Sequence, residues 1–485
     1  MIHNFGRNVA FQPQVVLTPR TEADVLQCLS QHRGRRIRAM GRLHAWSEAA
    51  RSDDVLLDLR HINHVQTEHR PDGVWATVGA GCQIKRLLAE LERQADVTLP
   101  SLGLVTEQAI AGAISTGTHG SGKHSLSHDM AEVRVATYDA ATGEPVIRTI
   151  SDGPELRAAR CSLGCLGVIL SVGFWCRAQY RVEEHFARYA NLDDVLSAEE
   201  RYPLQQFYLV PWMWAYYAQH RRETDAPRSG LARLYRWYCF LTLDIGLHLA
   251  VITLSRWLQS RRAIHVFFRH ILPWTVIRGW KVTDRSQAML IMEHELFRHI
   301  EIEVFVQRPQ LADALMFAQQ LLRHCDGERD AFSDDIRHQL QQHGLWDDVQ
   351  ASAGCFTACY PICIRKILPD DTLISMASSD GEPYYSLSFI SYARPNDRDG
   401  FFRFANCLSD ATVALYAARP HWGKVCPLTA TQAATLYPHL PAFRRVAREF
   451  DAAGVFLNDW VAGVLFGKNG QIALNPEGSQ PLAGG

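Results

Sequence analysis

Residues 102–122 carry glycines and small hydroxyl residues at a spacing that could bind an anion. Gly112, Gly117, Gly120 and Gly122 lie within eleven residues and alternate with serine and threonine. Glycine adopts positive φ without strain and leaves no side chain between its amide and a ligand. Because successive amides in such a turn form an anion-binding nest, the segment predicts a cradle for a pyrophosphate. A glycine-rich surface loop is the alternative interpretation.

Two other phosphate-binding patterns match the chain in part. Residues 117–124 (GTHGSGKH) nearly fit the P-loop, but His124 stands where the magnesium-binding hydroxyl belongs. A strand pattern over 132–139 follows, where a P-loop is followed by a helix. Residues 79–81 (GAG) come between a predicted strand and a predicted helix, but Ile84 occupies the third glycine position of the dinucleotide fingerprint. Both matches are weak for these reasons.

The segments around the cradle are predicted to form an α+β unit. A capping-box pattern begins at Thr21, with Asp24 three residues later, and predicts a helix that carries Val25 and Leu29 on one face. Apolar residues at helical spacing predict a second helix over 83–95. The predicted strands cover 36–40, 54–59, 74–78, 133–138 and 168–174. Together these elements make a unit of about 175 residues, a plausible size for one domain.

The 485-residue chain has the composition of a globular protein, with 47% hydrophobic and 21% charged residues. Its formal net charge of −1 gives no electrostatic reason to bind nucleic acid. The 12 cysteines are scattered without a short disulfide framework, and the N-terminus has no apolar signal region. We therefore expect a reducing, cytoplasmic location.

Three segments, in this order, resemble one family of flavoproteins. They are a GxxH loop at 41–44, an AGAxxTGTHGSG loop at 111–122 and an LGxLG-V segment at 163–168. They resemble the vanillyl-alcohol-oxidase superfamily of FAD-dependent oxidoreductases and, within it, the sugar-1,4-lactone oxidase and alditol oxidase branch. Near the C-terminus, 419–424 (RPHWGK) and 454–458 (GVFLN) are similar to the closing pattern of this branch. The resemblance covers 1–178 and 355–467 well and the intervening stretch loosely.

The resemblance implies an α+β architecture in which a two-subdomain FAD-binding domain of PCMH type carries an inserted α+β substrate cap. The implied parts are an FAD-binding domain over 1–178, a cap over 179–418, a C-terminal segment returning to the FAD site over 419–470, and a loose tail over 471–485. Within the cap, 300–306 and 384–392 alternate like strands, and apolar spacing over 311–322 predicts a helix.

By the same resemblance, FAD bonds covalently to His44 through its 8α-methyl carbon. Leu43 and Ala45 stand where the family has glycine and serine, so an unlinked or structural histidine is the alternative. We expect His119 to brace the cradle rather than to catalyse. The resemblance implies no metal ligand, and the expected cofactor-binding residues are Met40, Gly41, Arg42, Leu43, His44, Ala45, Ala109, Gly112, Thr116, Gly117, Thr118, His119, Gly120 and Val168.

The resemblance places two cations at the substrate. Arg365 lies on a predicted strand, and Lys424 ends the HWGK motif that also contains His421. Cations in these positions can stabilise an alkoxide-like oxygen or the negative charge of reduced flavin. We therefore expect Arg365, Lys424 and His421 to take part in catalysis, with Cys363 beside them.

Cys363 departs from the family, which has a glutamate at this position. A thiol is a weak hydrogen-bonding group, so the expected acceptor for substrate hydroxyls is missing. Glu301 and Glu303, on one face of another predicted strand, are the candidates to replace it. Cys355, Cys359 and Cys363 recur at every fourth position and are predicted to share a strand face, as buried thiols rather than metal ligands.

One stretch of the cap, 238–258, is apolar but interrupted by Asp244, His248 and Arg256. A spanning helix needs about twenty residues nearly free of charge, so these side chains argue against a transmembrane span. Basic residues flank the stretch, as in helices that lie at a membrane surface. Peripheral membrane contact and a packed or interface-forming helix are therefore the two interpretations.

Together, these features predict an FAD-dependent oxidoreductase that oxidises a CH–OH group of a sugar lactone, polyol or related alcohol. Hydride would pass to flavin N5, and O2, a quinone or a cytochrome would accept the electrons. An enzyme for a non-carbohydrate alcohol is the first alternative, because Cys363 removes a polyol-directed carboxylate. A flavin-binding protein without turnover and a P-loop nucleotide hydrolase are the others.

Overall fold

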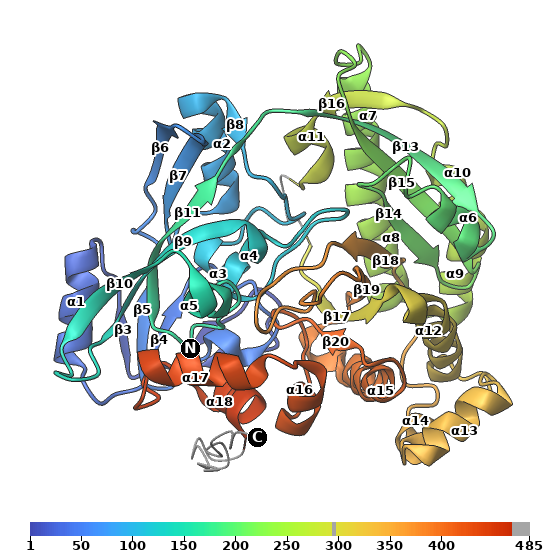
Figure 1. The fold of residues 1–485 in the computed structure, drawn as a ribbon. Coiled ribbons are helices and arrows are strands. Elements are labelled where there is room, and N and C mark those ends of the chain that lie inside the picture. Colours follow the sequence, from blue (N-terminus) through green and yellow to red (C-terminus); the bar gives the residue numbers. More distant parts are fainter. Residues whose placement is uncertain (293–296, 468–485) are drawn as a thin grey trace, which may run out of the picture.

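The computed structural model describes residues 1–292 and 297–467, and the predicted tail over 471–485 lies outside this range. Two bodies of sheet stand side by side (Figure 1). The N-terminal body has a three-stranded sheet, β3-β5-β4, and a five-stranded sheet, β10-β9-β11-β7-β6. Their strands are β3 (Val15–Leu17), β4 (Ile37–Met40), β5 (Val55–Asp58), β6 (Val65–Arg70), β7 (Gly73–Gly79), β9 (Met130–Tyr138), β10 (Pro145–Ile150) and β11 (Val168–Trp175).

Both helices predicted in this body are confirmed. In α1 (Glu22–Gln31), the Asp24 N–H donates to the Thr21 hydroxyl and the Asp24 carboxylate accepts from the Thr21 N–H, which completes the capping box. In α2 (Ile84–Ala95), the four apolar residues at helical spacing are buried. The chain from 117 to 124 leads through the short α4 (Leu126–Asp129) into β9, so it does not continue into the long helix of a P-loop.

The second body is an eight-stranded antiparallel sheet in the order β16-β13-β15-β14-β18-β19-β17-β20. Its strands are β13 (Arg181–Tyr189), β14 (Gln206–Val210), β15 (Ala215–Thr224), β16 (Val282–Arg285), β17 (Ile300–Gln307), β18 (Ile362–Ile367), β19 (Tyr384–Ser391) and β20 (Arg419–Pro420). Strand β17 reads IEIEVFVQ, and its isoleucines and valines pack with α12 (Leu311–Cys325) and α15 (Asp399–Tyr416). Its glutamates therefore point to the opposite face of the sheet.

The C-terminal segment joins the two bodies. Strand β20 pairs with β17 in the second sheet. The following helices, α16 (Ala430–Leu436), α17 (Leu440–Phe450) and α18 (Asp459–Phe466), lie beneath the N-terminal body (Figure 1). Phe443, Phe450 and Phe456 share one hydrophobic core with β5, β7 and β11.

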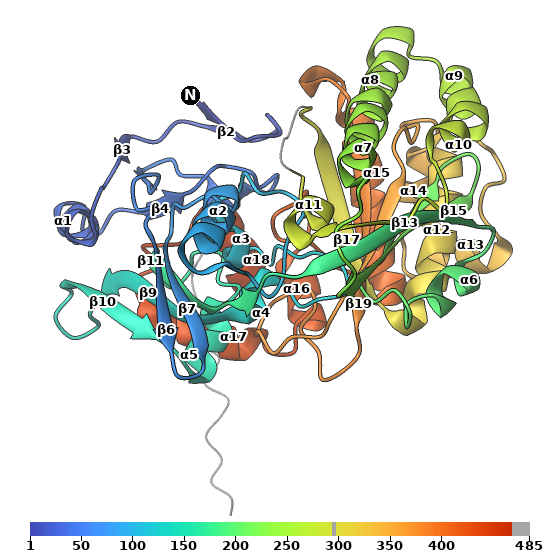
Figure 2. The same cartoon turned by 90° about the horizontal axis from the view of Figure 1, so that it is seen from above.

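A helical hairpin protrudes from the second body, with α7 and α8 beside α9 and α10 (Figure 2). One continuous helix runs over Ala232–Leu258 and has the length and composition to cross a membrane. Only 11% of its most apolar stretch of 18 residues is buried inside the protein. It combines α7 (Ala232–Cys239) and α8 (Leu247–Ile252) with two π-helical segments, Phe240–Gly246 and Thr253–Leu258. The return arm contains α9 (Arg261–Val266), a π-helical segment (Phe267–Ile271) and α10 (Leu272–Thr275).

The remaining helices are short and connect these parts. They are α3 (Ile110–Ser115), α5 (Gly153–Ala159), α6 (Leu192–Ser197), α11 (Ser286–Leu290), α13 (Asp334–Gln342) and α14 (Trp346–Ala351). Two further strand pairs are β1 (Ile2–His3) with β2 (Ala10–Phe11) and β8 (Val97–Thr98) with β12 (Arg177–Ala178).

Candidate active site

A cavity lies where the N-terminal loops meet the polar face of the second sheet; we call it the first cavity. Residues 37–46 and most of 104–119 line one side, and residues of β17, β18 and the 421–424 segment contribute to the other. Hydrogen bonds join the two sides: the Trp46 N–H donates to the Gly423 carbonyl at 2.9 Å, and the Ser47 hydroxyl donates to the Trp422 carbonyl at 2.6 Å. The site therefore depends on segments nearly 380 residues apart in sequence.

Two glycines in the cavity walls differ in the space beside them. A Cβ added at Gly41 would lie 2.6 Å from the Cβ of Ala109, so the 40–45 loop can pass the start of α3 only with glycine there. A Cβ added at Gly112 would meet nothing within 4 Å, and Gly112 lines the cavity. Backbone is thus exposed to the cavity on one side, as a flat, pyrophosphate-bearing cofactor requires.

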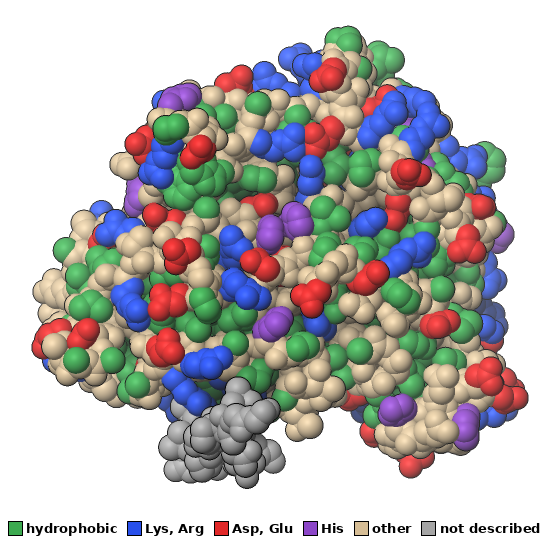
Figure 3. All heavy atoms as spheres, in the orientation of Figure 1, with side chains coloured by type: hydrophobic (Ala, Val, Ile, Leu, Met, Phe, Trp, Pro, Cys, Tyr) green, Lys and Arg blue, Asp and Glu red, His purple; other side chains and the backbone are tan. Residues whose placement is uncertain are grey.

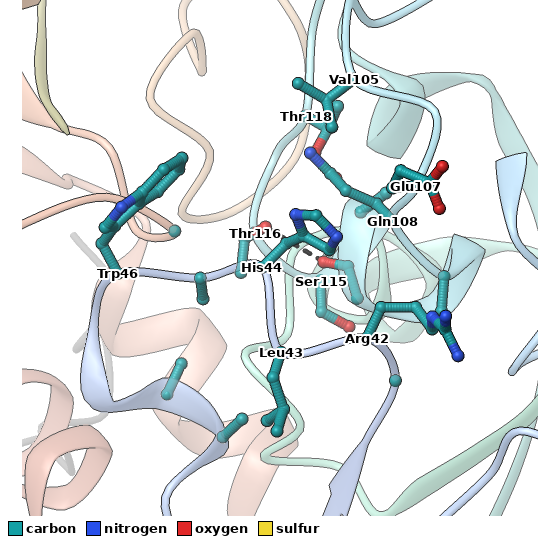
Figure 4. Close-up of a pocket in the computed structure, with 18 of the residues that line it drawn as sticks. Arg42, Leu43, His44, Trp46, Val105, Glu107, Gln108, Ser115, Thr116 and Thr118 are labelled. Carbon is teal, nitrogen blue, oxygen red and sulfur yellow. Dashed lines mark hydrogen bonds between the residues drawn. The ribbon is translucent and has the colours of Figure 1, made fainter. Parts of the chain in front are cut away.

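The GxxH loop keeps a glycine-like path although leucine occupies one of its positions. Leu43 has φ +55°, in the left-handed region, and its carbonyl accepts the Phe5 N–H at 2.8 Å. Its side chain packs near the small apolar cluster of Val9, Phe11, Met40 and Leu56. Figure 4 shows the Leu43 side chain directed away from the ring of His44. Leu43 therefore leaves the ring inside the cavity.

The ring of His44 is held and kept neutral. It stacks on Phe5, with ring centroids 5.0 Å apart and planes 19° apart. Burial lowers the pKa of His44 to about 4, so the imidazole is uncharged at neutral pH. A neutral imidazole nitrogen is the form that can attack an electrophilic carbon.

A buried carboxylate lies opposite these loops. Glu303 is 1% exposed, with its carboxylate 3.3 Å from His119 Nε2 and 3.9 Å from Arg365 Nη1. Its Oε1 atom has no hydrogen-bond partner among the described residues, and neither has Nε of Arg365. Burial alone would raise the pKa of Glu303, but the facing His119 ring, together with Lys424, holds it well below its usual range. The site therefore contains an ionised acceptor next to a fixed cation.

The hydrogen bonds of two histidines fix which ring nitrogens carry protons. His119 Nδ1 lies 2.9 Å from the Gly120 carbonyl, which can only accept, so Nδ1 is protonated and Nε2 faces Glu303. His421 Nδ1 accepts the Gly423 N–H at 2.8 Å, and burial lowers the pKa of His421 to about 3. His421 is therefore neutral, with its proton on Nε2.

Lys424 donates a hydrogen bond to a carboxylate, whereas Arg365 lies 3.9 Å from the carboxylate of Glu303. The Lys424 ammonium group donates to Glu301 and lies 4.4 Å above the ring centroid of Trp46. Glu301 also accepts from the Ser388 hydroxyl. Burial would raise the pKa of Glu301, but Lys424 lowers it to about 2, so both partners are charged. Lys424 and Glu301 thus neutralise each other beside the cavity.

The sequence matches two family descriptions that together cover most of the chain. They are the FAD binding domain over residues 13–144 and D-arabinono-1,4-lactone oxidase over residues 174–464. The chain belongs to the D-arabinono-1,4-lactone oxidase family. It is an FAD-dependent oxidoreductase acting on CH–OH donors, as the sequence motifs predict.

One relative of this chain is named an alcohol oxidase and others are named for sugar lactones. The chain is 54% identical over 462 residues to a long-chain alcohol oxidase from an uncultured marine euryarchaeote, and the match covers 95% of this chain and 96% of the relative. It is 26% identical to an L-gulono-1,4-lactone dehydrogenase from Mycobacterium tuberculosis, covering 93% and 96%. Cholesterol oxidase from B. sterolicum has the same fold, with a TM-score of 0.71 and 15% identity over 96% of each chain. The predicted PCMH-type α+β fold is therefore confirmed.

Most residues expected to hold FAD in this family member line the first cavity. They are Met40, Gly41, Arg42, Leu43, His44, Ala45, Ala109, Gly112, Thr116, Thr118, His119 and Val168. Gly117 and Gly120 do not line it. Gly117 has φ +77° and packs against Met376, and a side chain at Gly120 would overlap the Leu102 carbonyl. The positive φ at Gly117 and the close approach at Gly120 shape the loop.

The carboxylate of Glu303, on another strand, lies in the same row of the sheet as Cys363. Cys363 and Glu303 both pair with Ser388 of β19, so the three form one row across the sheet. Burial raises the pKa of the Cys363 thiol, which is therefore neutral. Cys363 does not line the first cavity. Cys355 and Cys359 precede β18, so the prediction that all three cysteines share a strand face is wrong.

His119, Glu303 and His421 each offer a ligand atom within 4.8 Å of the others, close enough to hold a metal ion. The guanidinium group of Arg365, 3.9 Å from Glu303, opposes a second cation at this place. The cluster is better suited to bind a hydroxyl group, because it combines one acceptor with several donors.

A second cavity of about 770 Å³ lies between the sheet and the hairpin. Six residues line both cavities and mark the passage between them: Leu104, Asp244, Met292, Tyr360, Arg365 and Ile390. The walls of the second cavity are largely apolar. Apolar lining residues include Phe186, Phe240, Leu243, Leu247, Val276 and Met289. Cys363 lines this second cavity.

Several polar groups in the second cavity are paired with one another. Glu184 accepts from Arg221 at 2.5 Å and from the Tyr235 hydroxyl at 2.7 Å. The Gln206 amide donates to Gln219 at 2.7 Å and to Tyr208 at 2.6 Å. Because these groups are already paired, they are not available to the hydroxyl groups of a polyhydroxylated ligand.

Proposed function

We propose that this enzyme oxidises the hydroxyl group of a long-chain aliphatic alcohol whose carbon chain occupies the second cavity. The observation that carries the proposal is the apolar second cavity, which meets the first cavity at Arg365. A relative 54% identical over nearly its whole length is named a long-chain alcohol oxidase, which supports the same substrate class. A sugar lactone, as in the names of more distant relatives, is the second candidate.

The charged cluster supports a simple division of roles. FAD, when bound, supplies the acceptor for the hydride that leaves the carbinol carbon. Glu303 accepts the hydroxyl proton, because its ionised carboxylate lines the first cavity close to Arg365 and His421. Arg365 and the Nε2–H of His421 stabilise the developing negative charge on the substrate oxygen. His119 orients the Glu303 carboxylate, and the Lys424–Glu301 pair holds the 421–424 segment in place.

We expect catalytic efficiency to rise with the length of a primary alcohol. Each methylene group buried in the second cavity contributes about 0.8 kcal/mol, or roughly a fourfold gain in kcat/KM, until the cavity is filled. Ala288 lines this cavity, so Ala288→Trp should shift the optimum to shorter alcohols. The measurement is O2 uptake with a series of primary alcohols.

The exposed turn residue Ala141 provides a matched control, because Ala141→Trp adds the same side chain away from both cavities. It should leave the chain-length profile unchanged. A flat profile for the native enzyme, or an Ala288→Trp profile equal to that of the control, would contradict the proposed role of the second cavity.

We further propose that FAD is covalently attached through His44. The neutral, stacked ring in the GxxH loop supports this attachment. After denaturation in acid and centrifugation of the wild-type protein, the yellow colour should remain with the polypeptide in the pellet. It should pass to the supernatant for His44→Ala, provided that this variant still binds FAD before denaturation. Release of all flavin from the native chain would exclude the covalent bond without affecting FAD binding itself.

A further inference from the structure

The outer face of the hairpin is unusually apolar. Fourteen large hydrophobic residues of the described chain are exposed, and eleven of them lie between 231 and 277. They are Leu231, Leu234, Trp237, Leu241, Leu249, Trp257, Leu258, Val266, Ile271, Trp274 and Ile277. Single exposed hydrophobic residues are ordinary, but such a concentration marks a surface that contacts a partner or a membrane. We call these eleven residues the apolar hairpin face.

The same segment carries strong positive charge. Residues 227–281 contain nine lysines and arginines and one acidic residue, Asp244, whereas the whole chain has a formal net charge of −1. Figure 3 shows Lys and Arg side chains gathered over the end of the molecule where β13, β16 and α7 lie. Exposed tryptophans next to arginines are typical of segments at a bilayer interface, and the charge complements anionic headgroups.

The opposite side of the hairpin is already occupied. Val251, Phe268 and Leu272 are buried in the core that also contains strand residues of the second sheet. The long helix therefore cannot be surrounded by lipid, although its length and composition would allow it to cross a membrane. This geometry fits a helix pair that lies at the surface of one leaflet.

The second cavity is continuous with this face. Trp237 lines the cavity and is also 61% exposed, and the neighbouring Arg233 and Arg236 line it too. An alcohol with a long alkyl chain is concentrated in lipid rather than in water, because each methylene group favours the apolar phase by about fourfold. A cavity that opens at the lipid surface would take up such an alcohol without exposing it to water.

We propose that the apolar hairpin face docks on an anionic lipid bilayer and that the second cavity receives its alcohol directly from that bilayer. The docking stands on the exposed residues and the local charge alone. The delivery step also rests on the proposed oxidation of long-chain alcohols.

The docking is tested by flotation of the holoenzyme with vesicles of phosphatidylcholine, alone or mixed with phosphatidylglycerol. We expect flotation with the mixed vesicles and weaker binding at higher salt. Trp257 and Trp274 are 75% and 88% exposed and line neither cavity. Trp257→Glu and Trp274→Glu should each weaken vesicle binding about tenfold or more. Met316→Glu, which alters an exposed hydrophobic residue of α12, should have no effect.

Activity separates docking from catalysis. Without vesicles, the tryptophan variants should oxidise a short, water-soluble alcohol at the native rate. With hexadecan-1-ol dissolved in the mixed vesicles, their rates should fall with their binding. Absence of flotation, or equal losses for Met316→Glu, would overturn the docking. A lipid-free native dimer that Trp257→Glu converts to a monomer would assign the face to a second copy of the chain. Vesicle binding together with oxidation of sugar lactones only would retain docking and overturn delivery.

Discussion

Replacing Glu303 by glutamine should slow flavin reduction by an alcohol about 10²- to 10⁴-fold, the range for loss of a positioned proton acceptor. Glutamine keeps the size of the side chain but cannot accept the hydroxyl proton. The effect is measured by mixing the enzyme with alcohol under anaerobic conditions and following the flavin absorbance. Because the pKa of Glu303 lies well below its usual range, native activity should not fall through protonation of this group near pH 4.3, the ordinary glutamate value.

Glu301→Gln is the matched control for this substitution. Glu301 lies on the same face of β17, but Lys424 and Ser388 already bond to its carboxylate. Loss of the Glu301 carboxylate should therefore disturb the position of Lys424 and lower the rate of flavin reduction about tenfold at most. This is far less than the effect of losing Glu303. Flavin reduction in Glu303→Gln at a rate within threefold of native would exclude Glu303 as the proton acceptor.

Replacing Arg365 by leucine should lower the rate of flavin reduction by about 10²- to 10³-fold, as for removal of one oxyanion donor. Arg365 lines both cavities, so its guanidinium group lies where the cavities meet and where the substrate oxygen is proposed to bind. Leucine would also leave Glu303 without its nearest arginine, and removing one partner of a buried pair costs about 3–5 kcal/mol of stability. The thermal midpoint should be measured with the rate.

Arg365→Lys distinguishes charge from packing. Lysine retains the positive charge but not the planar fork of donors, so stability should be largely restored and the rate only in part. If Arg365→Leu folds, binds FAD and reduces flavin at the native rate, the proposed role of Arg365 in stabilising the substrate oxygen is excluded.

The sequence alone predicted those parts of the candidate site that lie in short motifs. The 41–44 loop, the glycine cradle and the HWGK segment predict that His44, His119 and Lys424 belong to one site, and all three line the first cavity. Leu43 leaves the His44 ring unobstructed, because it adopts positive φ and its side chain points away from that ring.

The sequence named Glu301 and Glu303 as the candidate carboxylates, but strand register decides which of them lies beside Cys363. Glu303 reaches the row of Cys363 only because β17 and β18 both pair with β19. The acidic residues of the otherwise apolar stretch IEIEVFV were the available signal, since a buried charge needs a partner. Strands β6 and β10 were not predicted, because their exposed edge positions lack a regular apolar pattern. The second cavity arises from packing between the sheet and the hairpin, which no local pattern records.

Anaerobic flavin reduction by two substrates tests most directly whether the enzyme prefers a long-chain alcohol to a sugar lactone. The holoenzyme is mixed with dodecan-1-ol or with L-gulono-1,4-lactone, and the second-order rate of flavin bleaching is compared. Several methylene groups buried at about fourfold each predict a preference for the alcohol of at least about a hundredfold. Bleaching by the lactone at an equal or higher rate would contradict the assignment of the second cavity to an alkyl chain.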